Sequence, residues 1–297
     1  MLIIETIIFI LLSSLSLISL VGYGQILMLR YKFNFFISFF FGLIIWSLLI
    51  TGIHFFIKIN FYINIVIIIF GIFLFLIKFK LNHIKIFKKK YLTYFLIFLF
   101  LIPIFLSHKY HEDFGYYHLP YLISLAEQKI IFGLANSNIA YAHNSIWLNI
   151  IGIYLLPGNN YNFVLLPTFL IYVIFIIFCF EKILKHSEGQ ISNYFLIISL
   201  FYLILKFTRL SEYGNDLPST IISIVSIFYF IKYSETSDSQ KNIKYFYFNL
   251  VFAVFAILIK FSSIPVLFLS FILLINNFKN LYKIIFRTEF LLIYLLC

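Results

Sequence analysis

The residues best suited to chemistry gather in one short stretch, 107–120, which reads Ser-His-Lys-Tyr-His-Glu-Asp-Phe-Gly-Tyr-Tyr-His-Leu-Pro. Three histidines and two acids fall within eleven of these residues. Such a cluster suits either a carboxylate acting as general base on an acceptor hydroxyl or amine, or a divalent cation bound through Asp, Glu and His. An interfacial loop whose Tyr and His side chains anchor at the lipid headgroups is the alternative interpretation.

The two acids of this stretch are expected to have different roles. If the stretch is helical, Asp113 and Tyr117 share a face at positions i and i+4. The neighbouring Glu112 and Asp113 then point roughly 100° apart. We therefore expect one of the two acids to face the substrate.

A second polar stretch, 208–218, combines two acids with an arginine. Arg209 could hold a phosphate through its planar guanidinium group. Glu212 and Asp216 follow it, and Gly-Asn-Asp before Leu-Pro indicates a turn and the start of a helix. Capping of that helix by Asp216 explains this acid as well as a functional role does.

Two smaller polar features complete the set of candidates. Lys260 stands between two apolar runs, where it could bind a lipid phosphate or could extend its ammonium group to the membrane interface. His143 lies in an asparagine-rich stretch before Trp147, where amides beside an aromatic ring suit a sugar. Solvation of a loop explains that stretch equally well.

The composition indicates which elements must position these residues. Of 297 residues, 63% are hydrophobic and 11% are charged, and the mean hydropathy is +1.04. These values exclude a soluble globular domain. The net charge of +11 does not indicate nucleic-acid binding here, because Lys and Arg accumulate in the cytoplasmic loops of membrane proteins.

The apolar runs predict an all-α fold, a polytopic transmembrane helical bundle of about nine or ten spans, because an open strand cannot satisfy its backbone in lipid. The runs are 3–28, 35–57, 61–79, 91–107, 162–180, 191–207, 218–233, 245–259, 264–276 and 283–297. We expect a single integral membrane domain over 1–297. It divides into three N-terminal spans in 1–90, a region 91–275 with a long outer loop at 108–161, and an incomplete last span in 276–297.

The basic loops predict the orientation. If each run crosses once, the loops rich in Lys and Arg share the cytoplasmic side, and 108–161, 208–218 and 260–265 share the outer side. The apolar stretch 146–156 is too short to span. We predict that it forms an interfacial or re-entrant helix in the outer loop.

The acidic pair just after a span, in a long outer loop, resembles the GT-C membrane glycosyltransferases. The match rests on His111-Glu112-Asp113-Phe114-Gly115-Tyr116-Tyr117-His118 and covers roughly 91–275. The resemblance implies a polyprenyl-phosphate-linked sugar donor, with Asp113, or alternatively Glu112, as catalytic base or metal ligand. It maps a second outer acidic motif onto Glu212 and Asp216, and a lysine-containing outer turn onto Lys260.

The resulting hypothesis is a transferase on the outer, periplasmic face of a bacterial inner membrane. Asp113 would deprotonate or orient the acceptor, while Arg209 or Lys260 steadies the lipid phosphate. No cofactor is implied other than a divalent cation, for which His111 is the candidate ligand beside the acids. The expected partners are the lipid-linked donor and membrane lipids, with no nucleic acid. The substrate-binding candidates are Arg209, Glu212, Asp216, Lys260, His118, Tyr117 and His143.

Two other functions remain open. A transporter or flippase of a lipid-linked or anionic solute needs ionisable groups near the bilayer midplane, whereas the acids here cluster at predicted helix ends. A polymerase or ligase of surface polysaccharide would use chemistry close to that of the transferase.

Overall fold

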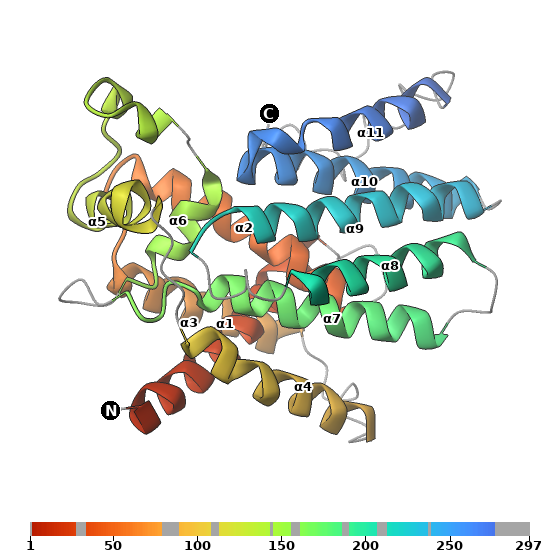
Figure 1. Ribbon diagram of the computed structural model, residues 1–297, viewed down its shortest axis with the longest axis horizontal. Coiled ribbons are helices and arrows are strands. Elements are labelled where there is room, and N and C mark those ends of the chain that lie inside the picture. The colour runs from red at the N-terminus through yellow and green to blue at the C-terminus, as the bar shows by residue number, and fades with distance from the viewer. Residues whose placement is uncertain are drawn as a thin grey trace. The chain divides into compact units, whose positions relative to one another are not determined.

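A computed structural model describes residues 2–27, 34–78, 89–107, 113–142, 145–155, 161–185, 190–206, 213–236 and 239–276. All regular elements in these ranges are helices (Figure 1), so the predicted all-α class is confirmed. The α-helices are α1 (Leu2–Leu27), α2 (Phe35–His54), α3 (Phe61–Lys78), α4 (Lys89–Leu106), α5 (Leu119–Glu127), α6 (Ile146–Gly152), α7 (Leu166–Lys185), α8 (Ile191–Leu205), α9 (Asp216–Glu235), α10 (Ser239–Ile259) and α11 (Pro265–Asn276).

The described helices carry the apolar composition of a membrane protein. Four of them contain stretches long and apolar enough to cross a bilayer, namely Ile4–Leu27, Phe35–His54, Leu166–Leu184 and Asp216–Glu235. Five more are apolar but shorter, in α3, α4, α8, α10 and α11. Together these nine helices match the first nine predicted runs, and the tenth run, 283–297, lies outside the described residues.

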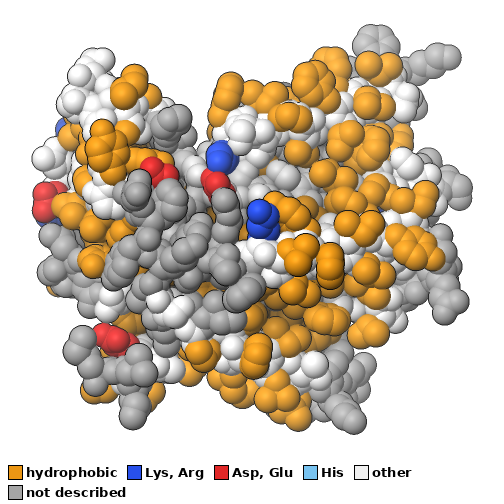
Figure 2. All heavy atoms as spheres, in the orientation of Figure 1, with side chains coloured by type: hydrophobic (Ala, Val, Ile, Leu, Met, Phe, Trp, Pro, Cys, Tyr) orange, Lys and Arg blue, Asp and Glu red, His pale blue; other side chains and the backbone are white. Residues whose placement is uncertain are grey.

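Helix α8 shows how these helices face lipid. Its exposed side chains are all apolar or aromatic, and they include a stripe at helical spacing formed by Tyr194, Ile198, Phe201 and Leu205. Its buried side is more polar, composed of Ser192, Asn193, Leu196, Ser199 and Leu203. A soluble protein would place these two sides the other way round. Figure 2 likewise shows hydrophobic side chains over much of the visible surface, so the protein is a membrane protein.

The chain divides into two compact units. The first contains residues 1–174 and 208–214, and the second contains 175–207 and 215–297. Helix α7 begins in the first unit and ends in the second.

In the first unit, glycines let α1 approach α2 and α3 at backbone distance. A Cβ atom built on Gly42 of α2 would lie 1.9 Å from the carbonyl oxygen of Leu20, and one on Gly24 would lie 1.7 Å from that of Ser38. On α3, a Cβ atom at Gly71 would lie 2.0 Å from the Ser19 hydroxyl. Membrane helices pack closely where small residues leave room, because lipid provides no hydrophobic force between them.

Helix α6 belongs to a re-entrant segment. It has seven residues, about 10 Å of helix, which is too short to span. Asn149 donates to the Thr51 hydroxyl near the end of α2 (2.8 Å), and Tyr154 donates to Ser16 in the middle of α1 (2.7 Å). Asn162 then donates to Glu5 near the start of α1 (3.4 Å). Ser16 lies about 16 Å along the helix from Glu5, so the chain descends into the unit and returns, which favours the re-entrant form of the two alternatives predicted for 146–156.

In the second unit, a buried polar group joins three helices. The Asn249 side chain of α10 donates to the carbonyl oxygen (3.1 Å) and the hydroxyl (3.0 Å) of Ser226 on α9. Its own side-chain oxygen accepts from Ser270 on α11 at 2.7 Å. Because these bonds satisfy the amide of a fully buried asparagine, they specify the register of α9, α10 and α11.

Candidate functional site

The part of the acidic stretch that the structure describes, 113–118, is helical, which is the condition under which Asp113 and Tyr117 are predicted to share a face. Asp113 is exposed and precedes a π-helical turn, Phe114–His118, which continues directly into α5. Single π-helical turns are rare and occur frequently at functional sites. The fold thus presents the Asp113 carboxylate to solvent at the head of an ordered turn.

Aromatic stacking joins this turn to the second polar stretch. The Phe114 ring stacks on Tyr213 with centroids 3.8 Å apart, and Tyr161 packs on the edge of Phe114 at 5.5 Å. Phe114 and Tyr213 are both buried. The structure therefore brings residue 213 of the second stretch onto the first stretch within the first unit. These three aromatic residues were not predicted from the sequence, since their only signal is that aromatic residues stand beside acids.

The two aromatic candidates next to Asp113 differ in exposure. Tyr117 is half-buried, and its ring centroid lies 4.2 Å from that of His118. His118 is only 8% exposed. A substrate could therefore reach Tyr117. The buried position of His118 suits a structural role in the π-helical turn better than contact with a substrate.

In the second unit, the start of α9 meets the turn between α10 and α11. Lys260, just after α10, forms an ion pair with the carboxylate of Asp216, the first residue of α9. Their side chains are 38% and 50% exposed, respectively. From the sequence, Asp216 and Lys260 are separate candidates, and the tertiary structure makes them partners.

Neutral side chains complete this group. Asn215 donates to the carbonyl oxygen of Ile259 at 3.1 Å, and the hydroxyls of Ser219 and Ser263 lie 2.6 Å apart. We call Asn215, Asp216, Ser219, Lys260 and Ser263 the α9-start cluster. Pro265 at the first position of α11 ends the turn, as is usual for helix starts.

The alternative prediction, that Asp216 is the capping residue of the helix that follows it, is wrong. The capping residue is Asn215, which makes no side-chain capping bond, and Asp216 lies within the first helical turn. A carboxylate there is still favourable beside the helix dipole. Its contact with Lys260 reflects the turn between α10 and α11, which the local sequence around Asp216 does not show.

The other candidates lie outside the described residues. They are Glu112, His111, His143, Arg209 and Glu212. Within the described ranges, no three His, Cys, Asp or Glu side chains group as ligands for a metal ion. Cation binding that involves Glu112 and His111 stays a prediction.

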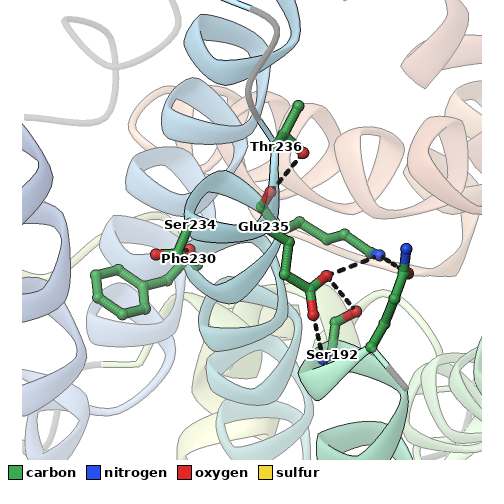
Figure 3. A network of polar contacts seen from close by, with 7 residues as sticks. Ser192, Phe230, Ser234, Glu235 and Thr236 are labelled. Atoms are coloured by element: carbon green, nitrogen blue, oxygen red, sulfur yellow. Dashed lines mark hydrogen bonds and ion pairs between the residues drawn. The ribbon is translucent and has the colours of Figure 1, made fainter.

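Another polar network lies at the C-terminal end of α9, around Glu235 (Figure 3). The Glu235 carboxylate accepts from the backbone N–H of Ser192 (2.9 Å) and from its hydroxyl (2.7 Å), at the start of α8. Lys232 donates to Glu235 at 3.0 Å and to Gln190 at 2.6 Å. Glu235 thereby caps α8 and pairs with a buried lysine, so the network has a structural role.

Replacement of Glu235 by alanine is expected to destabilise the second unit. It removes the cap of α8 and leaves buried Lys232 with Gln190 as its remaining described acceptor. We expect the free energy of unfolding to fall by about 2–3 kcal/mol, since each hydrogen bond to a charged group contributes roughly 1.5–3 kcal/mol. Thermal unfolding in detergent, followed by circular dichroism, measures this. The exposed Glu127→Ala provides the comparison, and equal midpoints for the two variants would contradict a structural role.

The Asp216–Lys260 pair is expected to add little to stability. Both groups are partly exposed, and exposed ion pairs contribute about 0–1 kcal/mol. A double-mutant cycle with Asp216→Asn and Lys260→Gln should therefore give a coupling free energy below about 1 kcal/mol. A coupling of several kcal/mol would contradict this expectation. The thermal midpoints of the two single variants, measured for the same cycle, show whether each one folds, so that a loss of activity in a folded variant reports on function.

Comparison with known proteins gives one match. The whole chain, residues 1–297, matches the family model DUF8201, described as a domain of unknown function. No curated protein and no solved structure matches the chain.

Proposed function

We propose that this chain, which belongs to the DUF8201 family of domains of unknown function, is a membrane glycosyltransferase. It moves a sugar from a polyprenyl-phosphate donor to an acceptor on the outer face of the membrane. The observation that supports this most strongly is the exposed Asp113 carboxylate at the head of the π-helical turn. A carboxylate in that position can take the proton of an incoming hydroxyl, and the ordered turn keeps the carboxylate oriented toward it.

Lys260 has the charge and exposure to hold the phosphate of the donor. In the structure its ammonium group is neutralised by Asp216, so a phosphate must compete with that carboxylate for the same hydrogens. Both side chains are partly exposed, which leaves them able to exchange partners. Arg209 is the second candidate for this role, from the sequence alone.

The positions of the charges favour an enzyme over a transporter. In the four long apolar helices of the described structure, the acids and bases lie near helix ends, at Glu5, Glu181, Lys182, Lys185, Asp216, Lys232 and Glu235. The middle of each of these helices carries none. Transporters place ionisable groups near the bilayer midplane, where they bind solute or couple ions.

The proposed location is a bacterial inner membrane with Asp113 on the periplasmic side. The periplasmic side for Asp113 rests on the basic loops, which the positive-inside rule assigns to the cytoplasm. A polymerase or ligase of surface polysaccharide would share this location, and it differs in the product it makes.

The test uses the full chain reconstituted in nanodiscs. It is given synthetic polyprenyl phosphates that carry hexoses or pentoses, together with membrane extract as the source of acceptors, and the release of free polyprenyl phosphate is measured. The proposal expects release from at least one donor that depends on the protein. Absence of release from every donor would refute it, and transfer of an oligosaccharide from a lipid diphosphate would identify a polymerase or ligase instead.

A further inference from the structure

The loop between α2 and α3 is hydrogen-bonded to the end of α5 and to the segment that follows it. The backbone N–H of Ile59 donates to the carbonyl oxygen of Leu125 at 2.9 Å, and that of Ile130 donates to His54 at 3.1 Å. The buried His54 ring is hydrogen-bonded to the carbonyl oxygen of Gln128 at 3.1 Å. These bonds join two segments that lie about seventy residues apart in the chain into one surface feature of the first unit.

This feature exposes six large apolar side chains. We call them the apolar tip: Phe55, Phe56, Ile57, Ile131, Phe132 and Ile139. Phe56, Phe132 and Ile139 are 82%, 84% and 81% exposed, and the rings of Phe55 and Phe132 lie 6.3 Å apart. The contact of Phe55 with Phe132 brings exposed apolar side chains of the two segments together, and exposed apolar surface of this kind marks a place of interaction.

The apolar tip lies beyond the spanning part of its helices. Residues 55–60 follow the end of α2, and 128–133 form bends and turns, including Gly133 with a φ of 79°. Irregular backbone exposed to lipid does not occur inside the hydrocarbon core, because its N–H and C=O groups would lack partners. The backbone therefore belongs at the level of the headgroups, with the apolar side chains available to reach the acyl chains.

The charges around the apolar tip indicate which partner it fits. The charged residues of 55–60 and 125–142 are Lys58, Glu127 and Lys129, and all three are exposed. Lysines beside exposed aromatic residues are typical of surfaces that bind anionic lipid. The tip also continues the exposed apolar side chains of α3, beginning at Tyr62 and Val66, which are 68% and 67% exposed.

We infer that the apolar tip inserts into a phospholipid monolayer and that Lys58 and Lys129 bind anionic headgroups beside it. The tip anchors the segment of α5 and the following turns to the membrane surface. This inference concerns a lipid contact and does not depend on the proposed glycosyltransferase activity.

The test places an environment-sensitive fluorophore on the tip. Phe132→Cys is labelled with NBD in a chain carrying Cys297→Ser, while the buried Cys179 is kept. The protein is reconstituted into phosphatidylcholine vesicles with and without phosphatidylglycerol. We expect quenching by doxyl-labelled lipid, little quenching by aqueous iodide, and a blue-shifted emission. The matched label on exposed Glu127→Cys should show the reverse quenching pattern.

The role of Lys58 and Lys129 is tested in the same labelled protein. In Phe132→Cys chains, Lys58→Gln combined with Lys129→Gln should remove any increase in lipid quenching that phosphatidylglycerol causes. Iodide quenching at residue 132 equal to that at residue 127 would overturn the inference, since the tip would lie in water. Protection of the residue 132 label from both quenchers would also overturn it, because protein, either a second copy or another chain, would then cover the tip.

Discussion

Asparagine in place of Asp113 is expected to lower the rate of sugar transfer by roughly 10²–10⁴-fold, the usual contribution of a general base. The amide has nearly the same shape but cannot accept the proton of the acceptor. Asp113 is exposed, so the substitution should leave the thermal midpoint unchanged. The measurement is the initial rate of polyprenyl phosphate release at saturating donor, for wild type and variant in nanodiscs.

Glu127→Gln is the matched control for this experiment. It also removes one exposed carboxylate from the segment after α4, and it should keep the wild-type rate. If Asp113→Asn retained activity while Lys260→Ala lost it, the catalytic role assigned to Asp113 would be wrong. A complete loss in Glu112→Gln with a normal Asp113→Asn would instead transfer the role to the neighbouring acid.

Replacement of Gly42 by alanine is expected to prevent the normal packing of α1 and α2. The added methyl group would lie 1.9 Å from the carbonyl oxygen of Leu20, and a backbone atom cannot rotate away as a side chain can. We expect the free energy of unfolding to fall by about 3 kcal/mol or more, at the upper end for overpacked cores. The yield of monodisperse protein in detergent and its thermal midpoint both measure this.

Gly52→Ala provides the control on the same helix. A Cβ atom there meets no heavy atom within 4 Å, and alanine is the better helix former by roughly 0.5–1 kcal/mol. This variant should therefore be as stable as the wild type or slightly more stable. Equal stability of the two alanine variants would show that α1 and α2 do not approach at Gly42.

The sequence by itself was sufficient for the membrane class and for most of the helices. Long apolar runs must become helices in lipid, because only a helix satisfies its backbone within one segment. The length that a span requires argued against 146–156 as a span, and length can be read directly from the sequence. The polar stretches could also be found directly, because acids and histidines stand out in a chain with so few charges.

Only the tertiary structure decided which residues are partners. The ion pair of Asp216 with Lys260 joins residues 44 positions apart, and the contact of Glu235 with Ser192 joins residues 43 apart. Stacking of Phe114 on Tyr213 joins residues much farther apart than these, and the buried bonds of Asn249 reach residues 23 and 21 positions away. Helical periodicity specifies which side of a helix a residue occupies, but it does not specify the neighbour or the register. Those depend on where backbones approach, as at Gly42, and on which buried polar groups can satisfy one another.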